Sequence, residues 1–102
     1  GGALPYLVGR FDAAFEKMPP CREIISELPS SYYNRLYFDS ISYTQEALEL
    51  CLNVAGSEKL LYGSDYPHNV GDMEGCLSRV EALPSNVQNA VKGGNAIRLF
   101  GL

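Results

Sequence analysis

The segment Lys59-Leu60-Leu61-Tyr62-Gly63-Ser64-Asp65-Tyr66-Pro67 combines a strand pattern with a carboxylate at its end. Residues 60–62 are continuously apolar, as expected for a parallel strand that is covered on both faces. The glycine and the polar residues that follow are typical of the end of a strand. We therefore predict a buried strand over residues 59–63, with Asp65 just beyond its carboxyl end.

A second strand precedes this one, because residues 36–41 form a short run rich in aromatic and branched side chains. Before it, apolar residues recur three and four positions apart from Leu4 to Met18, which predicts a helix that Pro19 and Pro20 terminate. Weaker apolar spacing in residues 24–28 suggests a further short helix.

Between the strands, an apolar stripe over residues 48–55 predicts a helix that ends at Gly56. Ser42 and Gln45 have the spacing of a capping box at its start. After the second strand, Asp72 is predicted to cap another helix.

Near the carboxyl end, Gly93 and Gly94 are expected to break the chain, and Asn95 to cap a last helical turn.

The alternation of helices and strands predicts an α/β fold with parallel strands. Two strands cannot close a barrel, and a complete eight-fold barrel needs about 250 residues. The 102 residues therefore form either a small two-stranded α/β unit or one part of a larger domain whose sheet has further strands.

Composition excludes several function classes. The formal net charge is −4, and the eight basic residues are scattered, which argues against nucleic acid or an anionic membrane as the partner. No apolar run approaches the ~20 residues of a membrane span. The first residues have no initiator Met and no basic region, so we expect no signal peptide and take them for the middle of a longer chain. Three cysteines without a CxxC pair favour buried thiols in a reducing cytoplasm.

Three blocks in order carry a resemblance to a known family. They are Gly1-Gly2-Ala3-Leu4-Pro5-Tyr6-Leu7-Val8-Gly9-Arg10, then Leu61-Tyr62-Gly63-Ser64-Asp65-Tyr66-Pro67, then Gly94-Asn95-Ala96-Ile97-Arg98-Leu99-Phe100-Gly101-Leu102. Together they resemble the last third of amidohydrolase-related proteins of the aminocarboxymuconate-semialdehyde decarboxylase type.

The resemblance implies a (β/α)8 TIM-type barrel of the metal-dependent hydrolase superfamily, of which residues 1–102 would be the C-terminal portion. Residues 59–63 would be the last barrel strand and residues 36–41 the strand before it. It implies that Asp65 is a ligand of a divalent metal, commonly zinc, and takes part in catalysis. It also implies that Arg10 binds a substrate carboxylate, in some members across a subunit boundary, so we expect a homo-oligomer.

The family's remaining site residues have no counterpart here. Its His-x-His on the first strand, a metal-binding His on a middle strand and a catalytic His directly before the Gly-Gly block do not occur in these residues. His68 is the one histidine of the chain and matches none of them. A loop residue without partner ligands is the simpler interpretation of His68, with substrate contact as the alternative.

The site residues also have simpler interpretations. A carboxylate just past a parallel strand lies where α/β folds place their chemistry, but an Asp there can equally cap a turn. A guanidinium suits carboxylate binding, but a single Arg is more often a surface residue. Asp39, at the end of the first strand, could face the site or serve as a structural hydrogen-bond acceptor.

The function predicted for the complete protein is a metal-dependent carbon–carbon lyase, a decarboxylase, or a hydrolase that acts on a small carboxylate-bearing substrate. The alternative is a non-catalytic, stand-alone α/β interaction or oligomerisation module. Under the enzyme interpretation the 102-residue chain alone is expected to be inactive. Its two strands would also expose unpaired edges once their barrel neighbours are missing.

Overall fold

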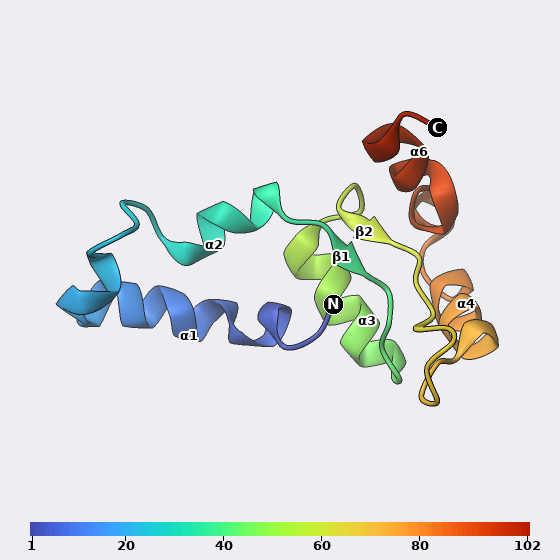
Figure 1. Cartoon of the computed structure of the whole chain (residues 1–102), viewed down its shortest axis with the longest axis horizontal. Helices are drawn as coiled ribbons and strands as arrows, with labels where there is room; N and C mark the ends of the chain where they lie inside the picture. Colours follow the sequence, from blue (N-terminus) through green and yellow to red (C-terminus); the bar gives the residue numbers. More distant parts are fainter.

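A computed structural model describes all residues from Gly1 to Leu102 (Figure 1). The elements follow one another as α1 (Leu4–Lys17), η1 (Pro19–Arg22), α2 (Pro29–Tyr32), η2 (Tyr33–Arg35), β1 (Phe38–Asp39), α3 (Gln45–Ala55), β2 (Leu60–Leu61), α4 (Met73–Glu81), α5 (Ser85–Asn89), η3 (Ala90–Gly94) and α6 (Asn95–Phe100). No helix is long and apolar enough to cross a lipid bilayer.

The two strands are parallel, as the helix–strand alternation predicts. Phe38 pairs with Leu60 and Asp39 with Leu61, and both arrows point the same way in Figure 1. The paired segments are shorter than the predicted strands over residues 36–41 and 59–63. Regular pairing is confined to the two residues of each strand that lie directly opposite each other.

The core lies where the strands meet α3 and the C-terminal helices. Phe38 and Leu60 contribute the strand side chains, and Leu48 on α3 is fully buried. The helices that follow β2 supply the rest of the core, which consists of Val80, Leu83, Val87 and Val91, with Tyr33 and Cys51 completing the cluster. The apolar strand residues are therefore covered from two sides, as in a parallel sheet.

The edge of β2 that faces away from β1, here the outer edge, is partly paired with the chain's own C-terminal helices. Lys59 and Leu61 direct their carbonyls toward β1, so Leu60 and Tyr62 face the outer edge. There the Tyr62 N–H donates to the Val91 carbonyl over 2.9 Å, and the Asn95 side-chain amide donates to the Leu60 carbonyl over 2.7 Å. The expectation of an unpaired edge is therefore wrong for these two groups of β2.

Two sequence predictions near the carboxyl end are wrong for the same reason. Gly93 and Gly94 do not break the chain, because η3 is a π-helix that joins α5 to α6 without interruption. Asn95 is no helix cap: it is fully buried, and its amide also donates to the Ser57 carbonyl over 2.7 Å. These tertiary hydrogen bonds outweigh the modest helix penalty of two glycines.

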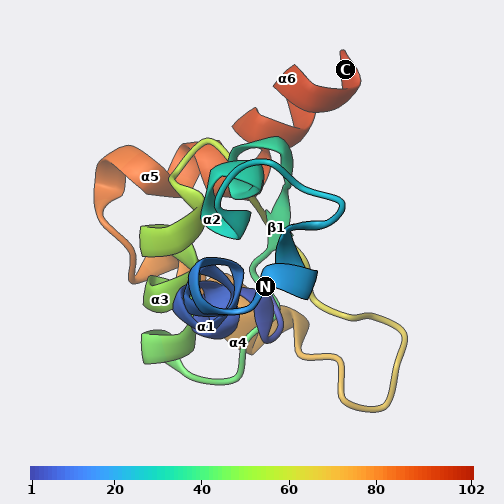
Figure 2. The same cartoon turned by 90° about the vertical axis from the view of Figure 1, so that its left-hand side faces the viewer.

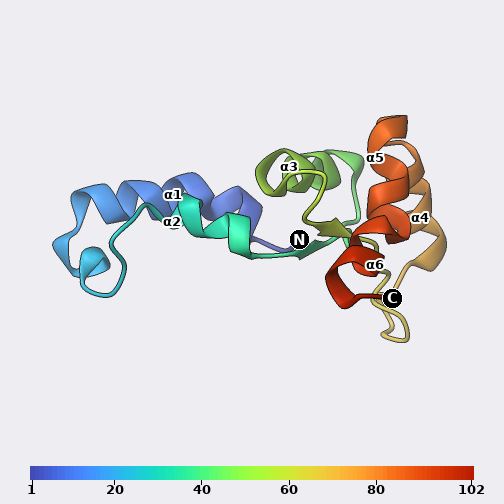
Figure 3. The ribbon, with the colours of Figure 1, turned by 90° about the horizontal axis from the view of Figure 1, so that it is seen from above.

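α1 and α2 form an arm that extends away from the strands (Figures 1 and 3). α1 ends one residue before the predicted boundary, with its first-turn proline in place. The helix predicted over residues 24–28 does not form. Ile24 is 97% exposed there, so no packing partner stabilises a helix at that point, and the next helix begins at Pro29 instead.

The other helix caps agree with the sequence in two places and differ in one. Gly56 ends α3 with a positive φ of 83°, and the Asp72 carboxylate accepts from the Gly75 N–H at the start of α4. α3 is capped by Thr44, whose hydroxyl accepts from the Ala47 N–H, and not by Ser42. Its first helical residue is Gln45, so the capping position is one residue ahead of it.

Candidate metal and substrate site

Asp65 lies four residues beyond the end of β2, in a strained backbone conformation. Its φ of 59° falls in the left-handed region, which Asp and Asn tolerate better than most residues other than glycine. The carboxylate accepts no hydrogen bond and forms no ion pair within the chain, and the side chain is only partly buried. The alternative in which this carboxylate caps the turn is therefore wrong.

The turn around Asp65 is held by main-chain groups. The His68 N–H donates to the Asp65 carbonyl over 2.9 Å, and the Gly71 N–H donates to the His68 carbonyl over 2.8 Å. The Asp72 N–H then returns to the Ser64 carbonyl over 2.9 Å, closing the segment at its base. Residues 64–72 form the projecting loop shown in yellow to orange in Figure 2.

Ser40 connects the two strands beyond their regular pairing. It is fully buried, and its hydroxyl accepts from the Gly63 N–H over 3.1 Å. A Cβ at Gly63 would lie 3.2 Å from the Ile41 side chain, so a larger residue here would need that side chain to shift. Sequence reasoning did not identify Ser40, and the available signal was a small hydroxyl residue directly after the first strand.

Asp39 has a structural role in this chain. Its Oδ1 accepts from the Ile41 N–H over 2.8 Å and lies 2.6 Å from the Gly1 nitrogen. The Gly1 nitrogen is also 2.7 Å from the Asp39 carbonyl. Of the two readings of Asp39 that the sequence left open, the hydrogen-bonding one describes its contacts here.

A cavity of about 320 Å³ opens at the carboxyl end of β1. Asp39, Tyr43 and Cys51 are among the residues that line it. Burial, reinforced by the negative charge of Asp39, raises the pKa of the Cys51 thiol. The thiol therefore stays protonated near neutral pH and is a poor nucleophile. Cys51 and Cys76 are buried as predicted, whereas Cys21 is exposed on η1.

The structure does not bring Arg10 to Asp65. Arg10 is exposed in the middle of α1, where it borders a shallow depression with Ala14 and Met18. α1 runs away from the strands (Figure 3), and the Arg10 side chain is exposed on this arm. His68 is also exposed, and its imidazole makes no hydrogen bond.

No set of three or more His, Cys, Asp or Glu side chains lies close enough together to hold one metal ion. Asp65 nevertheless fits the role of one ligand. Its oxygens are free of competing donors, and a carboxylate is a common ligand of divalent ions such as zinc and manganese. The remaining ligands of such an ion would have to come from residues outside this chain.

Comparison with known proteins gives the family. A family model described as Amidohydrolase matches residues 3–102. The chain belongs to the amidohydrolase family. Among curated relatives, 2-amino-3-carboxymuconate-6-semialdehyde decarboxylase of Dictyostelium discoideum is 27% identical over 100% of this chain and 29% of its own length.

Solved structures share the fold of this amidohydrolase chain over nearly all of its 102 residues. The apo form of IDCase from Metarhizium anisopliae superposes with a TM-score of 0.82 at 22% identity, over 99% of this chain and 32% of that one. Dihydroxybenzoic acid decarboxylase from Polaromonas sp. JS666, with bound manganese and the inhibitor 2-nitroresorcinol, gives 0.80 at 23% identity, over 98% and 31%. The chain therefore spans about a third of the length of the proteins that it matches.

Proposed function

We propose that this chain is the C-terminal portion of a metal-dependent decarboxylase whose substrate is a small carboxylate-bearing molecule. The observation that carries the proposal is the free carboxylate of Asp65, which a strained turn holds just beyond a parallel strand. Non-glycine residues in the left-handed region cluster at functional sites, where the surrounding structure maintains the strain. Asp65 would be one metal ligand and thereby a catalytic residue.

Zinc is our proposed metal, with manganese as the other candidate because it is bound in the Polaromonas relative. A divalent ion bound by Asp65 would polarise an oxygen of the substrate. The chain's own contribution is to position Asp65 through the main-chain hydrogen bonds of its loop. These bonds do not involve the carboxylate, whose oxygens stay free to bind the ion. Asp39 would keep its structural role at the neighbouring strand end.

The names of the relatives favour decarboxylation over hydrolysis. The Dictyostelium relative is a decarboxylase of a carboxymuconate semialdehyde, and the Polaromonas one of dihydroxybenzoic acid. In such a reaction the bond from the carboxylate carbon to the ring or chain carbon breaks, CO2 leaves, and a proton takes its place. We extend this reaction class to the complete protein, with an unsaturated or aromatic carboxylate as the substrate.

We further propose that the complete protein is a (β/α)8 barrel in which β1 and β2 are the last two strands. Chain length supports this, since the relatives are about three times longer. A buried oxygen supports it too. Oδ1 of Asn95 lies at the outer edge of β2 without a hydrogen-bond partner, which is rare in complete native proteins. An N–H from a part of the complete protein outside this chain would satisfy it.

Arg10 would bind the substrate carboxylate of a neighbouring subunit in a homo-oligomer. Its exposed position on the arm, away from Asp65 of the same chain, supports a role across a subunit boundary. The planar guanidinium offers two parallel donors to a carboxylate.

The test is a turnover assay on the complete protein that contains this chain. CO2 release would be measured with 2-amino-3-carboxymuconate-6-semialdehyde and with 2,6-dihydroxybenzoate, for the wild type and for Asp65→Asn. Asparagine tolerates the same backbone conformation, so this variant removes the charge without adding strain. Glu74→Gln serves as the control, because its exposed side chain makes no hydrogen bond.

We expect the wild type and the control to release CO2 from at least one substrate and Asp65→Asn to lose at least about a hundred-fold in rate. A turnover of Asp65→Asn equal to that of the control would contradict the assignment. Failure of the wild type to release CO2 from either acid would contradict the proposed reaction class.

A further inference from the structure

One side chain from another element holds the middle of the loop, residues 65–71. The Tyr43 hydroxyl, on the segment between β1 and α3, donates a 2.8 Å hydrogen bond to the Val70 carbonyl. Every other hydrogen bond made by residues 65–71 is internal to the loop. Val70 itself is 64% exposed, so its side chain provides little packing of its own.

The tethered part of the loop lies directly against the backbone of Asp65. A Cβ added at Gly71 would come within 2.8 Å of the Asp65 carbonyl oxygen and within 3.0 Å of its carbonyl carbon. Gly71 therefore lies close enough to the Asp65 peptide that a shift of residues 70–71 toward it would press on that peptide. The hydrogen bond from Tyr43 thus restrains Asp65 through one intervening contact.

The restraint acts on Asp65, whose backbone conformation is unfavourable for a residue other than glycine. Asp65 is the one non-glycine residue of the chain with a positive φ, and such conformations persist only when neighbouring contacts maintain them. Tyr43 also lines the cavity at the end of β1, so its side chain lies between that strand end and the loop that its hydroxyl binds. The position of the Asp65 carboxylate therefore depends on the segment that follows β1.

We infer that Tyr43 is a positioning residue for the metal ligand Asp65. This rests on the proposed function, since it takes Asp65 as a ligand. Tyr43 does not touch the ion; it keeps the Asp65 loop in the geometry in which the carboxylate converges with ligands from the rest of the protein. Contacts that orient metal ligands commonly change metal affinity when they are removed.

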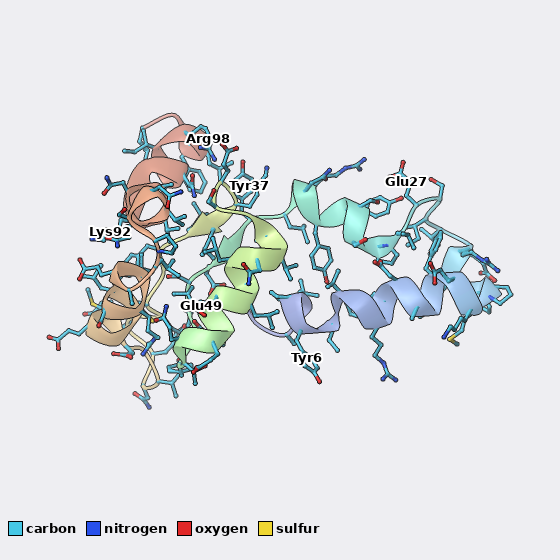
Figure 4. The ribbon with its side chains drawn as sticks, turned by 180° about the vertical axis from the view of Figure 1, so that it is seen from behind. Tyr6, Glu27, Tyr37, Glu49, Lys92 and Arg98 are labelled. Carbon is cyan, nitrogen blue, oxygen red and sulfur yellow. The ribbon has the colours of Figure 1, made fainter.

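The experiment uses the complete protein and the variant Tyr43→Phe, which removes the hydroxyl and keeps the ring. Tyr6→Phe is the matched control, because Tyr6 is 79% exposed and points away from the body of the molecule in Figure 4. Zinc affinity would be measured by competition with a chromogenic chelator, and amide hydrogen exchange at Tyr62 and Asp72 would be followed in the same samples.

Loss of one neutral hydrogen bond is expected to weaken zinc binding by about three- to ten-fold and to speed exchange at Asp72. Exchange at Tyr62, whose N–H bonds to Val91, should not change, because the core is intact. Gly71→Ala, which presses on the same peptide, should weaken zinc binding as well.

Each other outcome has a distinct meaning. Zinc affinity of Tyr43→Phe equal to that of Tyr6→Phe, while Asp65→Asn loses zinc, overturns the positioning role and leaves the proposed function intact. Faster exchange at Tyr62 as well as at Asp72 would show general destabilisation and would also overturn the positioning role. Undiminished zinc binding by Asp65→Asn would overturn the proposed function and the inference together.

Discussion

The side-chain amide of Asn95 donates a 2.7 Å hydrogen bond to the carbonyl of Leu60, two fully buried residues 35 positions apart. The same amide donates to Ser57, so a single side chain at the start of α6 fixes both the entry to β2 and its outer edge. This arrangement connects the C-terminal Gly-Asn-Ala block to the strand that precedes Asp65.

Asn95→Ala should therefore destabilise the protein. The substitution leaves two carbonyls unpaired in a buried place and removes packed atoms, at a cost of about 2–4 kcal/mol in the free energy of unfolding. Urea unfolding followed by circular dichroism measures this. The control is Asn89→Ala, an exposed position, and equal stability of the two variants would show that the buried amide contributes nothing.

The contact between Asp72 and Arg79 predicts a dependence of stability on pH. The hydrogen bond from Arg79, 2.8 Å long, and the one from the Gly75 N–H hold the pKa of the Asp72 carboxyl below its usual range. A carboxyl whose pKa is lower in the folded state stabilises the fold above its unfolded pKa, about 3.9, and loses that contribution as pH falls through the folded value.

Urea unfolding of the wild type and of Asp72→Asn from pH 7 to pH 2 measures this contribution. Asparagine caps helices well, so the comparison isolates the charge. The wild type should be the more stable protein at neutral pH, with the difference shrinking below about pH 4. A difference that stays constant down to pH 2 would refute the assignment to Asp72.

Much of the fold is readable from local patterns. The apolar spacing from Leu4 onward predicts α1 to within one residue, and Gly56 and Asp72 mark helix ends because their signals are local. The role of Asn95 is not readable in this way. A polar residue after two glycines has the pattern of a helix cap, and only the tertiary structure shows that its amide bonds to strand carbonyls.

The candidate site likewise has features that the sequence predicts and features that only the tertiary structure shows. The place of Asp65 beyond a buried strand is predictable because the signal is local, while its role as a metal ligand stays a prediction. The contact of Tyr43 with Val70 joins segments 27 residues apart, and no periodicity in the sequence indicates it. The distance of Arg10 from the strands likewise depends on the direction in which α1 extends, which sequence spacing does not specify.

The subunit-boundary role of Arg10 predicts complementation between inactive variants. Arg10→Ala and Asp65→Asn should each abolish turnover of the complete protein. If the oligomer is a dimer with shared sites, random mixing of the two variants places both intact residues in one site of each mixed dimer. About a quarter of the wild-type activity should then return. Mixing that restores no activity would assign Arg10 to its own chain's site, and undiminished turnover of Arg10→Ala by itself would make it a surface residue.

The 102-residue chain alone is predicted to be inactive and to bind zinc no better than a generic acidic surface. Asp65, even with His68 nearby in the sequence, provides fewer than the three or four converging ligands of a tight site. Chelator competition on the purified chain measures this. Stoichiometric binding with a sub-micromolar dissociation constant would mean that these residues carry a complete site.

The central claim is that Asp65 ligates a divalent metal in the complete protein, and metal content tests it most directly. Elemental analysis by plasma mass spectrometry would compare the complete wild-type protein with Asp65→Asn after identical dialysis. The claim predicts about one zinc or manganese ion per wild-type chain and a large loss in the variant, with far-UV circular dichroism unchanged. Equal metal content in the two proteins would contradict it.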